Sequence, residues 1–444
     1  MTESSIEAAG AEAADSHVAP RPARGYAYYV LGVLTLVYVV NFIDRQILSI
    51  LMEPIRLDLH LNDSELGLLS GLSFALFYAA FGLPIARLAD TGSRRNIIAA
   101  CLAAWSLMTG VCGFAQSFVQ LLLARIGVSI GEAGASPSSH SLIADLFPHG
   151  KRSTALAIYS TGIPIGTLIG LAAGGWINEA FNWRAAFMVI GVPGVVVAAL
   201  VALTVREPAR GGADHAAAIH APPGSLRALW AIKSYRRLTI AASLHAFTAY
   251  AGLQWNPAFM IRIHHMKTGQ VGLLLGLIIG VTGVAGTLGG GLLSDLFGRK
   301  DARWYAWLPA MVIGAAIPFY LAAYLAQSAS AALLLLIMPA LAGNCFTGPV
   351  FGAVQSLAPL RTRALAAAVL LFVISVVGLG LGPLLVGVLS DLLASALGRN
   401  SLRWAMCAAA VAEAASIAVF LRAADSLRAD LAAAHAQAEA GALA

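Results

Sequence analysis

Two stretches of this sequence follow one pattern at an offset of 205 positions. Residues 86–95 read ARLADTGSRR, and residues 291–300 read GLLSDLFGRK. Each has a small residue, an acidic residue four positions later, a second small residue after three more, and then two basic residues. Each also follows a long apolar run. The repetition predicts a duplicated chain in which the same polar loop joins two apolar helices in each half.

Other matches occur in the same order in the two halves. The first match pairs Pro148, Arg152 and Ala155 with Pro359, Arg363 and Ala366, at an offset of 211. The second match pairs Trp183-Arg184 with Arg403-Trp404, in reversed order. Because each match lies in a corresponding loop and the offset drifts slowly, we interpret the chain as two repeats that differ by small insertions.

The composition predicts an integral membrane protein. Of the 444 residues, 59% are hydrophobic and 11% are charged, with a mean hydropathy of +0.78. A soluble domain carries about 25% charged residues, so this chain has too few to cover a soluble surface. The apolar content excludes a chain that is mainly disordered. Four cysteines exclude a disulfide scaffold.

The apolar runs have the length of membrane-spanning helices, each of which needs about 20 apolar residues. The sequence lacks the alternating segments of about 10 residues that a β-barrel needs, so we expect an all-α fold. The twelve predicted spans are 26–52, 64–90, 95–115, 118–146, 152–180, 184–206, 235–261, 269–297, 303–325, 330–358, 363–394 and 403–421.

The basic residues predict the orientation. Of the 28 Lys and Arg residues, 20 fall on the side of the spans that holds the N-terminus, six fall on the other side, and two, Arg45 and Arg125, lie within spans. An excess of basic residues marks cytosolic loops, so we expect both termini in the cytosol. The same bias largely explains the net charge of +6, and a nucleic-acid partner is not needed to account for it.

The hydrophilic stretch between the sixth and seventh spans divides the chain. It is rich in Pro, Gly and basic residues, which is typical of a linker. We predict a disordered cytosolic tail over 1–25, a six-helix bundle over 26–206, a cytosolic linker over 207–234, a second six-helix bundle over 235–421 and a cytosolic tail over 422–444. No signal peptide is expected, because the N-terminal stretch is Ala-rich and acidic.

Charged residues inside the first half mark a candidate site. In the first span, Asn41, Asp44 and Arg45 share one helix face, with Tyr38 one turn earlier. In the fourth span, polar residues recur every three or four positions and form one stripe: Arg125, Ser129, Glu132, Ser136 and Ser139. Such a stripe must face protein or a water-filled cavity. A network that only holds the two helices together is the alternative interpretation.

The second half offers neutral and aromatic candidates for a substrate cavity between the halves. These are Tyr250, Gln254, Trp255, Asn256, Asn344 and Thr347. His245 is interpreted as a packed core residue, and His140 as a spectator. Glu413 stands alone in the last span, and no role is assigned to it. A cavity that is ionic on one side and apolar on the other suits a substrate with a charged head and an apolar tail.

The six-plus-six arrangement with both termini inside resembles the major facilitator superfamily, in which the substrate lies between two repeats near the middle of the membrane. Residues 86–95 resemble the superfamily's loop motif, with departures at Ala86, Thr91 and Ser93. The resemblance implies a cytosolic gate, with Asp145 as a partner for an arginine of the motif. By this resemblance, the residues of the gate are Asp90, Arg94, Arg95, Asp145, Asp295 and Arg299. The alternative interpretation is that the arginines only set the orientation of the chain in the membrane.

A narrower resemblance rests on two motifs. Residues 41–45, NFIDR, resemble a motif of spinster-like transporters and of some organic-anion symporters. Residues 131–133, GEA, and 144–147, ADLF, are more similar to spinster proteins. The resemblance implies a proton-linked transporter of lysolipids or sphingoid phosphates.

These observations lead to one hypothesis for the mechanism. Asp44 and Glu132 bind and release protons, with Arg45 and Arg125 as their charge partners. Protonation frees an arginine for a phosphate or carboxylate headgroup, which a guanidinium binds with two donors. It also shifts the balance between two conformations. A multidrug or organic-anion carrier is an alternative, and a lipid scramblase or a receptor is an alternative of another class.

Other classes of activity are not expected. The sequence lacks a G-x-x-x-x-G-K-[ST] motif, so we do not expect an ATP-driven pump. We expect a transporter rather than an enzyme. Cys101, Cys112, Cys345 and Cys407 lie within spans and suggest neither a disulfide nor a metal site. We expect no cofactor besides a proton gradient, a monomer in the lipid bilayer, and a location in a bacterial inner membrane.

Overall fold

The structure is a computed structural model that describes residues 24–208, 226–359 and 362–443. These residues form helices and no strand. Ten segments of the described chain are long and apolar enough to cross a membrane. The last of them, from Leu365 to Ala434, contains two helical passes, and the 32-residue helix Lys233–His264 is a further one. The all-α fold with twelve spans is therefore confirmed.

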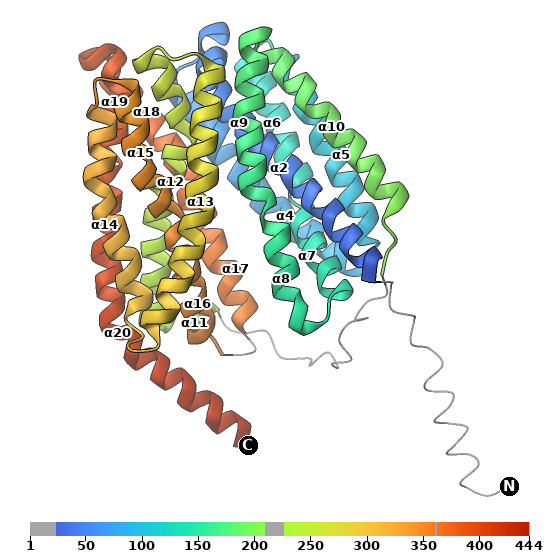
Figure 1. The fold of residues 1–444 in the computed structure, drawn as a ribbon, viewed down its shortest axis with the longest axis vertical. Coiled ribbons are helices and arrows are strands. Elements are labelled where there is room, and N and C mark those ends of the chain that lie inside the picture. Colours follow the sequence, from blue (N-terminus) through green and yellow to red (C-terminus); the bar gives the residue numbers. More distant parts are fainter. Residues whose placement is uncertain (1–23, 209–225, 360–361, 444) are drawn as a thin grey trace, which may run out of the picture.

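The first half of the chain forms one bundle (Figure 1). Its helices are α2 (Arg24–Leu59), α3 (Asp63–Gly67), η1 (Leu68–Leu72), α4 (Ser73–Thr91), α5 (Arg94–Cys112), α6 (Phe118–Glu132), α7 (Ala135–Leu146), α8 (His149–Ser160), α9 (Gly162–Ala180) and α10 (Trp183–Thr204).

The second half forms the other bundle (Figure 1). Its helices are α11 (Leu226–Ala231), α12 (Lys233–His264), α13 (Thr268–Gly298), α14 (Trp304–Leu325), α15 (Ala329–Cys345), α16 (Thr347–Leu357), α17 (Arg363–Ile374), η3 (Ser375–Leu381), α18 (Gly382–Leu397), η4 (Gly398–Asn400), α19 (Ser401–Ala408) and α20 (Ala410–Leu443). The predicted tail over 422–444 continues the last helix as far as Leu443.

The exact domain boundaries stay predictions. Most of the predicted N-terminal tail, 1–23, and most of the predicted linker, 209–225, lie outside the described residues. The part of the linker that follows them contains α11 and the start of α12.

The duplication is visible in the way two spans are interrupted. The fourth span breaks at residues 133–134, between α6 and α7, and the tenth span breaks at Phe346, between α15 and α16. In both cases a proline, Pro137 or Pro349, is the third residue of the new helix. Proline fits the first turn of a helix because the N–H that it lacks would have no partner within the helix there. The interruption near Pro137 thus recurs at the equivalent place in the second half.

Two seams join the bundles at one end of the molecule. In the first, α9 packs against α13, and a methyl group at Gly272 would lie 2.8 Å from the Leu171 carbonyl carbon. In the second, α3 and η1 pack against η3 and α18, and a methyl group at Gly67 would lie 2.6 Å from the Pro383 carbonyl oxygen. Both seams therefore need glycine for the close approach of two backbones.

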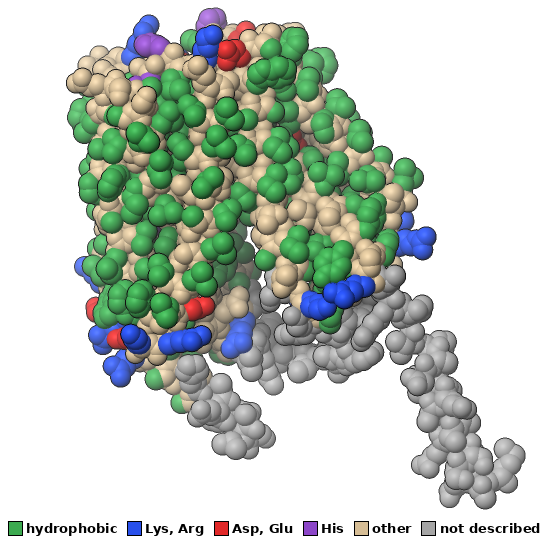
Figure 2. Space-filling view, viewed as in Figure 1, with side chains coloured by type: hydrophobic (Ala, Val, Ile, Leu, Met, Phe, Trp, Pro, Cys, Tyr) green, Lys and Arg blue, Asp and Glu red, His purple; other side chains and the backbone are tan. Residues whose placement is uncertain are grey.

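The bundles separate toward their other end. We call this the basic end, because Arg24, Arg94, Lys151 and Arg237 lie there, and we call the end with the two seams the opposite end. In Figure 1, α8 and α17 lie apart near the basic end, and Figure 2 shows a hollow between the two bundles that opens toward it. The structure therefore presents an inner space that is closed at the opposite end.

Gly272→Ala tests the first seam. Overpacking of a tight interface costs about 1–3 kcal/mol, so we expect the thermal-unfolding midpoint of the purified protein to fall by several degrees. Gly289→Ala is the control on the same helix, because a methyl group there meets nothing within 4 Å. It should leave the midpoint unchanged or raise it slightly, since alanine favours helix. Equal midpoints for the two variants would contradict the seam.

Candidate functional site

A largely buried ion pair joins two helices of the first bundle. The Arg45 Nε on α2 donates to the Glu132 Oε2 at the end of α6, at 2.7 Å. The Glu132 side chain is completely buried, whereas 22% of the Arg45 side chain is exposed. The pair therefore has one hidden member and one member that a molecule in the inner space can contact.

Asp44, the neighbour of Arg45 on α2, is fully buried. It is close to Trp105 and Thr109 on α5 and to Arg125 on α6, although neither of its oxygens has a hydrogen-bond partner among the described residues. Two Arg125 nitrogens also lack a partner there, and its guanidinium lies 5.5 Å from the Phe74 ring centre. Arg125 is thus a neighbour of Asp44, and with the described residues it forms no ion pair within 4 Å.

Aromatic rings surround the accessible part of Arg45. Its guanidinium carbon lies 5.4 Å from the ring centre of Phe42 and 5.0 Å from those of Phe74 and Tyr78. Tyr250 on α12 of the other bundle is close enough to interact electrostatically with Arg45. These contacts surround a cation with ring faces, which attract it. The site therefore draws side chains from both halves of the chain.

A second aromatic group continues this surface toward the basic end. Tyr38 stacks on Tyr159, with ring centres 4.3 Å apart, and the exposed His140 meets the Tyr159 ring edge-on at 5.3 Å. Ser136 and Ser139 on α7 are close to the Tyr159 hydroxyl. Three predicted cavity residues of α2 and α7 are thus brought together around Tyr159, which the sequence analysis did not single out.

In the second bundle, the predicted cavity residues divide into two groups. Asn344 and Thr347 flank the break between α15 and α16, and both are partly exposed. Asn256 is also partly exposed, and its side-chain oxygen accepts a hydrogen bond from the Tyr324 hydroxyl at 2.6 Å. Gln254 is buried.

Other predicted cavity residues are packing residues in this structure. Trp255 is completely buried, and its indole N–H donates to the Pro383 carbonyl at 2.9 Å. Ser129 is also buried, and it donates to the Phe74 carbonyl at 2.7 Å. Asn41 is 2% exposed. In this conformation these three side chains are buried between helices, and their place on a cavity surface stays a prediction.

At the basic end, Arg94 holds several segments of the first bundle together. It forms ion pairs with Asp145 on α7 and, at 2.7 Å, with Glu207, which follows α10. Burial alone would raise the pKa of Glu207, but hydrogen bonds from the Arg95 backbone N–H and from Arg94 hold this pKa below its ordinary value. The pairing of Arg94 with Asp145 is as predicted. In the described part of the chain, its polar contacts lie within the first bundle and two residues that follow α10, so these contacts do not join the two halves.

The remaining residues of the predicted cytosolic gate are less constrained. Arg95 is partly exposed, and its Nε donates to the Asn96 side chain at 2.9 Å. In the second copy of the motif, Asp295 and Arg299 are exposed. The Asp90 side chain lies outside the described residues. Whether these groups act as a gate stays a prediction.

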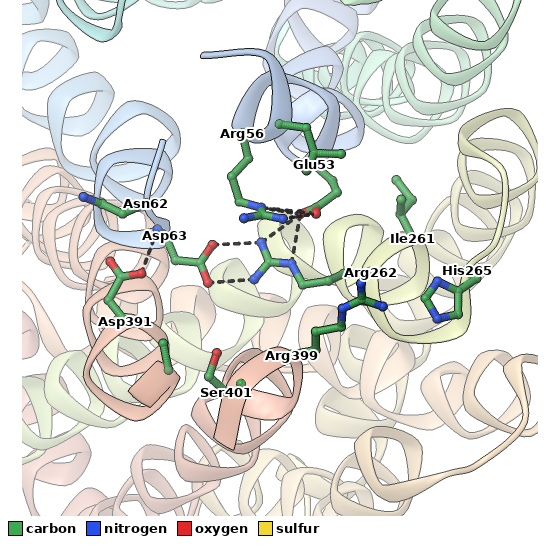
Figure 3. Close-up of a pocket in the computed structure, with 13 residues that line it drawn as sticks. Glu53, Arg56, Asn62, Asp63, Ile261, Arg262, His265, Asp391, Arg399 and Ser401 are labelled. Atoms are coloured by element: carbon green, nitrogen blue, oxygen red, sulfur yellow. Dashed lines mark hydrogen bonds and ion pairs between the residues drawn. The ribbon is translucent and has the colours of Figure 1, made fainter. Parts of the chain in front are cut away.

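A network of ion pairs closes the opposite end, and the sequence analysis did not foresee it. Arg262 at the end of α12 donates to Asp63 Oδ1 and Oδ2, both at 2.8 Å, and to Glu53 Oε2 at 2.9 Å. Arg56 also binds Glu53, at 2.7 Å. Figure 3 shows Arg262 between the two carboxylates, beside a pocket of about 440 Å³. One arginine of the second bundle thus joins two acids of the first.

Two further acids cap helices across the bundle boundary. Asp391 on α18 accepts hydrogen bonds from the backbone N–H groups of Asp63 and Ser64, at 3.0 and 2.7 Å, at the start of α3. Glu179 on α9 accepts one from the Gly269 N–H, at 3.1 Å, at the start of α13. A carboxylate at a helix N-terminus is favoured by the free N–H groups and the helix dipole.

The two caps correspond to each other in the internal repeat. Asp391 follows Glu179 by 212 positions, and Thr268, the first residue of α13, follows Asp63 by 205 positions. These offsets are close to those of the sequence repeat. Each bundle therefore caps the equivalent helix of the other bundle, and the opposite end is closed symmetrically.

Another contact was also missed by sequence reasoning. Glu413, to which no role was assigned, lies 2.9 Å from His245, which was interpreted only as a core residue. Hydropathy finds such residues as exceptions in apolar spans, but it does not show which helices become neighbours. Among the described residues, no group of three or more His, Cys, Asp or Glu side chains could hold a metal ion.

Arg262→Gln tests the closure of the opposite end. The variant leaves Glu53 and Asp63 without their shared partner, and a hydrogen bond to a charged group contributes about 1.5–3 kcal/mol. We expect more frequent opening, measured as faster maleimide labelling of Ser49→Cys in a background without native cysteines. Ser49 is buried one turn below Glu53.

Arg184→Gln is the matched control for this test. Arg184 pairs with Asp58 at 2.6 Å within the first bundle, so its loss should leave labelling unchanged. If Arg262→Gln and Arg184→Gln label at the same rate, the ion pairs between the bundles do not keep this end closed.

Comparisons with known proteins agree with this geometry. Residues 34–383 match the family model described as Major Facilitator Superfamily. An MFS-type efflux pump of Mycolicibacterium smegmatis is 35% identical over 88% of this chain and 90% of its own. The sphingosine-1-phosphate transporter SPNS2 of Danio rerio is 27% identical over 61% of this chain and 57% of its own.

A solved structure extends the match to the whole fold. The crystal structure of a bacterial homolog of the human lysosomal transporter spinster, in an inward-facing and unoccupied conformation, superposes with a TM-score of 0.84. It shares 30% identity and covers 92% of this chain and 99% of its own. Like the matched proteins, this chain is a transporter rather than an enzyme. It belongs to the major facilitator superfamily, as a spinster-like member.

Proposed function

We propose that this protein is a proton-coupled secondary transporter that works by alternating access. Its substrate is an amphiphile with an anionic or zwitterionic head, such as a lysophospholipid or a sphingoid phosphate. The observation that carries the proposal is the partly exposed Arg45, which lies between aromatic rings and is paired with the fully buried Glu132.

The pair supplies a route from proton binding to substrate binding. While Glu132 is ionised, it holds the Arg45 guanidinium. A proton on Glu132 removes that attraction, and Arg45 can then bind a phosphate or carboxylate with two parallel donors. The rings of Phe42, Tyr78 and Tyr250 offer apolar surface beside the head. Asp44, also buried, is the second acid of the proposed switch, with Arg125 nearby.

The switch also needs two conformations with opposite access. The conformation described above is open at the basic end and closed at the opposite end by Arg262 and the two helix caps. We propose that the basic end faces the cytosol, with both termini there, in agreement with the excess of basic loops. We further propose a monomer in a bacterial inner membrane, with the proton gradient as its energy source.

A second candidate has a specific observation in its favour. The relative in Mycolicibacterium smegmatis is named as an efflux pump, so export of drug-like cations or organic anions through the same cavity is the alternative. Uptake of labelled lysophospholipid, sphingosine-1-phosphate and ethidium into proteoliposomes, with and without a pH gradient, separates the two. Gradient-driven accumulation of the first two alone supports the lipid proposal, and accumulation of ethidium alone contradicts it.

The double variant Asp44→Asn/Glu132→Gln tests the proton switch. It keeps the side-chain sizes but removes both acids, so transport in proteoliposomes should lose most of its response to the pH gradient. Asp58→Asn is the control, because Asp58 is an exposed acid outside the cavity. Full proton dependence in the double variant would refute the switch.

Arg45→Gln should raise KM about tenfold to a hundredfold, which is the equivalent of one hydrogen bond to a charged group.

A further inference from the structure

Three polar contacts join α12 to the last span of the second bundle in antiparallel register. They are the Ser416 hydroxyl to the Ala241 carbonyl at 2.8 Å, Glu413 to His245 at 2.9 Å, and the Thr248 hydroxyl to the Ala409 carbonyl at 3.0 Å. The outer two contacts are hydrogen bonds to backbone carbonyls. The middle contact joins two titratable side chains, and the proton switch proposed above does not use it.

The His245–Glu413 pair is buried, and its imidazole lies within hydrogen-bond distance of its carboxylate. The His245 Nδ1 lies 2.9 and 3.0 Å from the two carboxylate oxygens, and the two residues are 2% and 7% exposed. Of the described residues, no other charged side chain forms an ion pair with either of them. The Tyr320 hydroxyl on α14, which donates to the Met406 carbonyl, interacts electrostatically with Glu413. Tyr320 is in turn a neighbour of Tyr324 on α14 and of the Cys407 thiol on α19.

The charge state of this pair is restricted by its surroundings. With a charged imidazolium and an ionised carboxylate, the pair is neutral overall. Gaining one proton makes it positive, and losing one makes it negative. Each change leaves a net charge in an apolar interior, where an uncompensated charge is unfavourable. A proton can therefore bind or leave only if nearby dipoles favour the new charge.

The neighbouring helix end favours a positive charge. The His245 ring lies beside the Ala342 and Gly343 carbonyls in the last turn of α15, and its edge-to-face contact with Phe346 has a centre distance of 4.9 Å. The last carbonyls of a helix lack intrahelical partners and carry partial negative charge. The state with an extra proton on Glu413 is thus favoured over the state that has lost one.

The same helix end is the break between α15 and α16. Asn344 lies just before this break, and Thr347 begins the next helix. When Glu413 is protonated, its hold on the imidazolium weakens, and the α15 carbonyls become the stronger attraction. The protonation state of the pair thereby acts on the part of the tenth span that carries two predicted cavity residues.

We propose that His245 and Glu413 form a second proton-binding site, located in the second bundle and acting on the break between α15 and α16. The ligand is a single proton, taken up on the Glu413 carboxylate. The proposal rests on the proton-coupled transport proposed above, but proton binding at this pair is measurable without any substrate.

Proton uptake by the purified full-length protein tests the site directly. An acid–base titration in detergent from pH 8 to pH 5 compares the wild type with His245→Asn/Glu413→Gln, which replaces both titratable groups by amides. We expect the double variant to bind about one proton fewer per chain. Thr248→Val removes a neighbouring contact without a titratable group, so it should bind as many protons as the wild type. Equal uptake by all three proteins would overturn the proposal.

Infrared difference spectra assign the proton to its residue. Acidification of the wild type should produce the carbonyl-stretch band of a protonated buried carboxylic acid, and Glu413→Gln should lack part of that band. Thr248→Val should retain it. If the band is identical in the wild type and in Glu413→Gln, the assignment of the proton to Glu413 is overturned. This conclusion holds even if the Glu413→Gln protein is less stable than the wild type.

A transport measurement separates this inference from the proposed function. With labelled lysophosphatidylglycerol as the probe, the double variant should accumulate less substrate than the wild type at the same pH gradient, because fewer protons are coupled to each cycle. Thr248→Val should match the wild type. If the wild type itself does not move the probe, the proposed function fails for this substrate, while the titration still decides whether the pair binds a proton.

Discussion

The structure depends on one ion pair in the apolar interior, between Arg45 and Glu132. Removing either charge leaves the other without its partner, which is costly in a medium that solvates ions poorly. The pair therefore constrains the approach of α2 to α6, and it links the protonation of a hidden acid to the freedom of a cation that a substrate can contact. Asp44 and Arg125 lie close enough to be influenced by every change in it.

The two ends of the molecule use charge in different ways. At the opposite end, Arg262 and the capping acids Asp391 and Glu179 join one bundle to the other, and the glycine seams bring the backbones together beneath them. At the basic end, Arg94 makes its contacts within one bundle. Contacts between the bundles are thus concentrated at one end, which is the arrangement that alternating access requires of a state open at the other end.

The sequence was sufficient for the fold and for the charged members of the site. Hydropathy and the internal repeat predicted twelve spans, and the three- and four-residue spacing on α6 and α7 identified Glu132. Contacts between distant helices could not be predicted in this way. The contacts of Arg262 with Asp63, of Trp255 with Pro383 and of Glu413 with His245 are examples, because each depends on which helices become neighbours.

The central claim is that protons on the buried acids of the first bundle change which end is open. Electron–electron double resonance in lipid nanodiscs tests it most directly, with one spin-label pair at Ile158 and Ser356 near the basic end and another at Phe181 and Ala396 at the opposite end. Lowering the pH should change the two distances in opposite directions, and Asp44→Asn/Glu132→Gln should show the low-pH distances at every pH. Distances in that variant that still respond to pH as in the wild type would contradict the account.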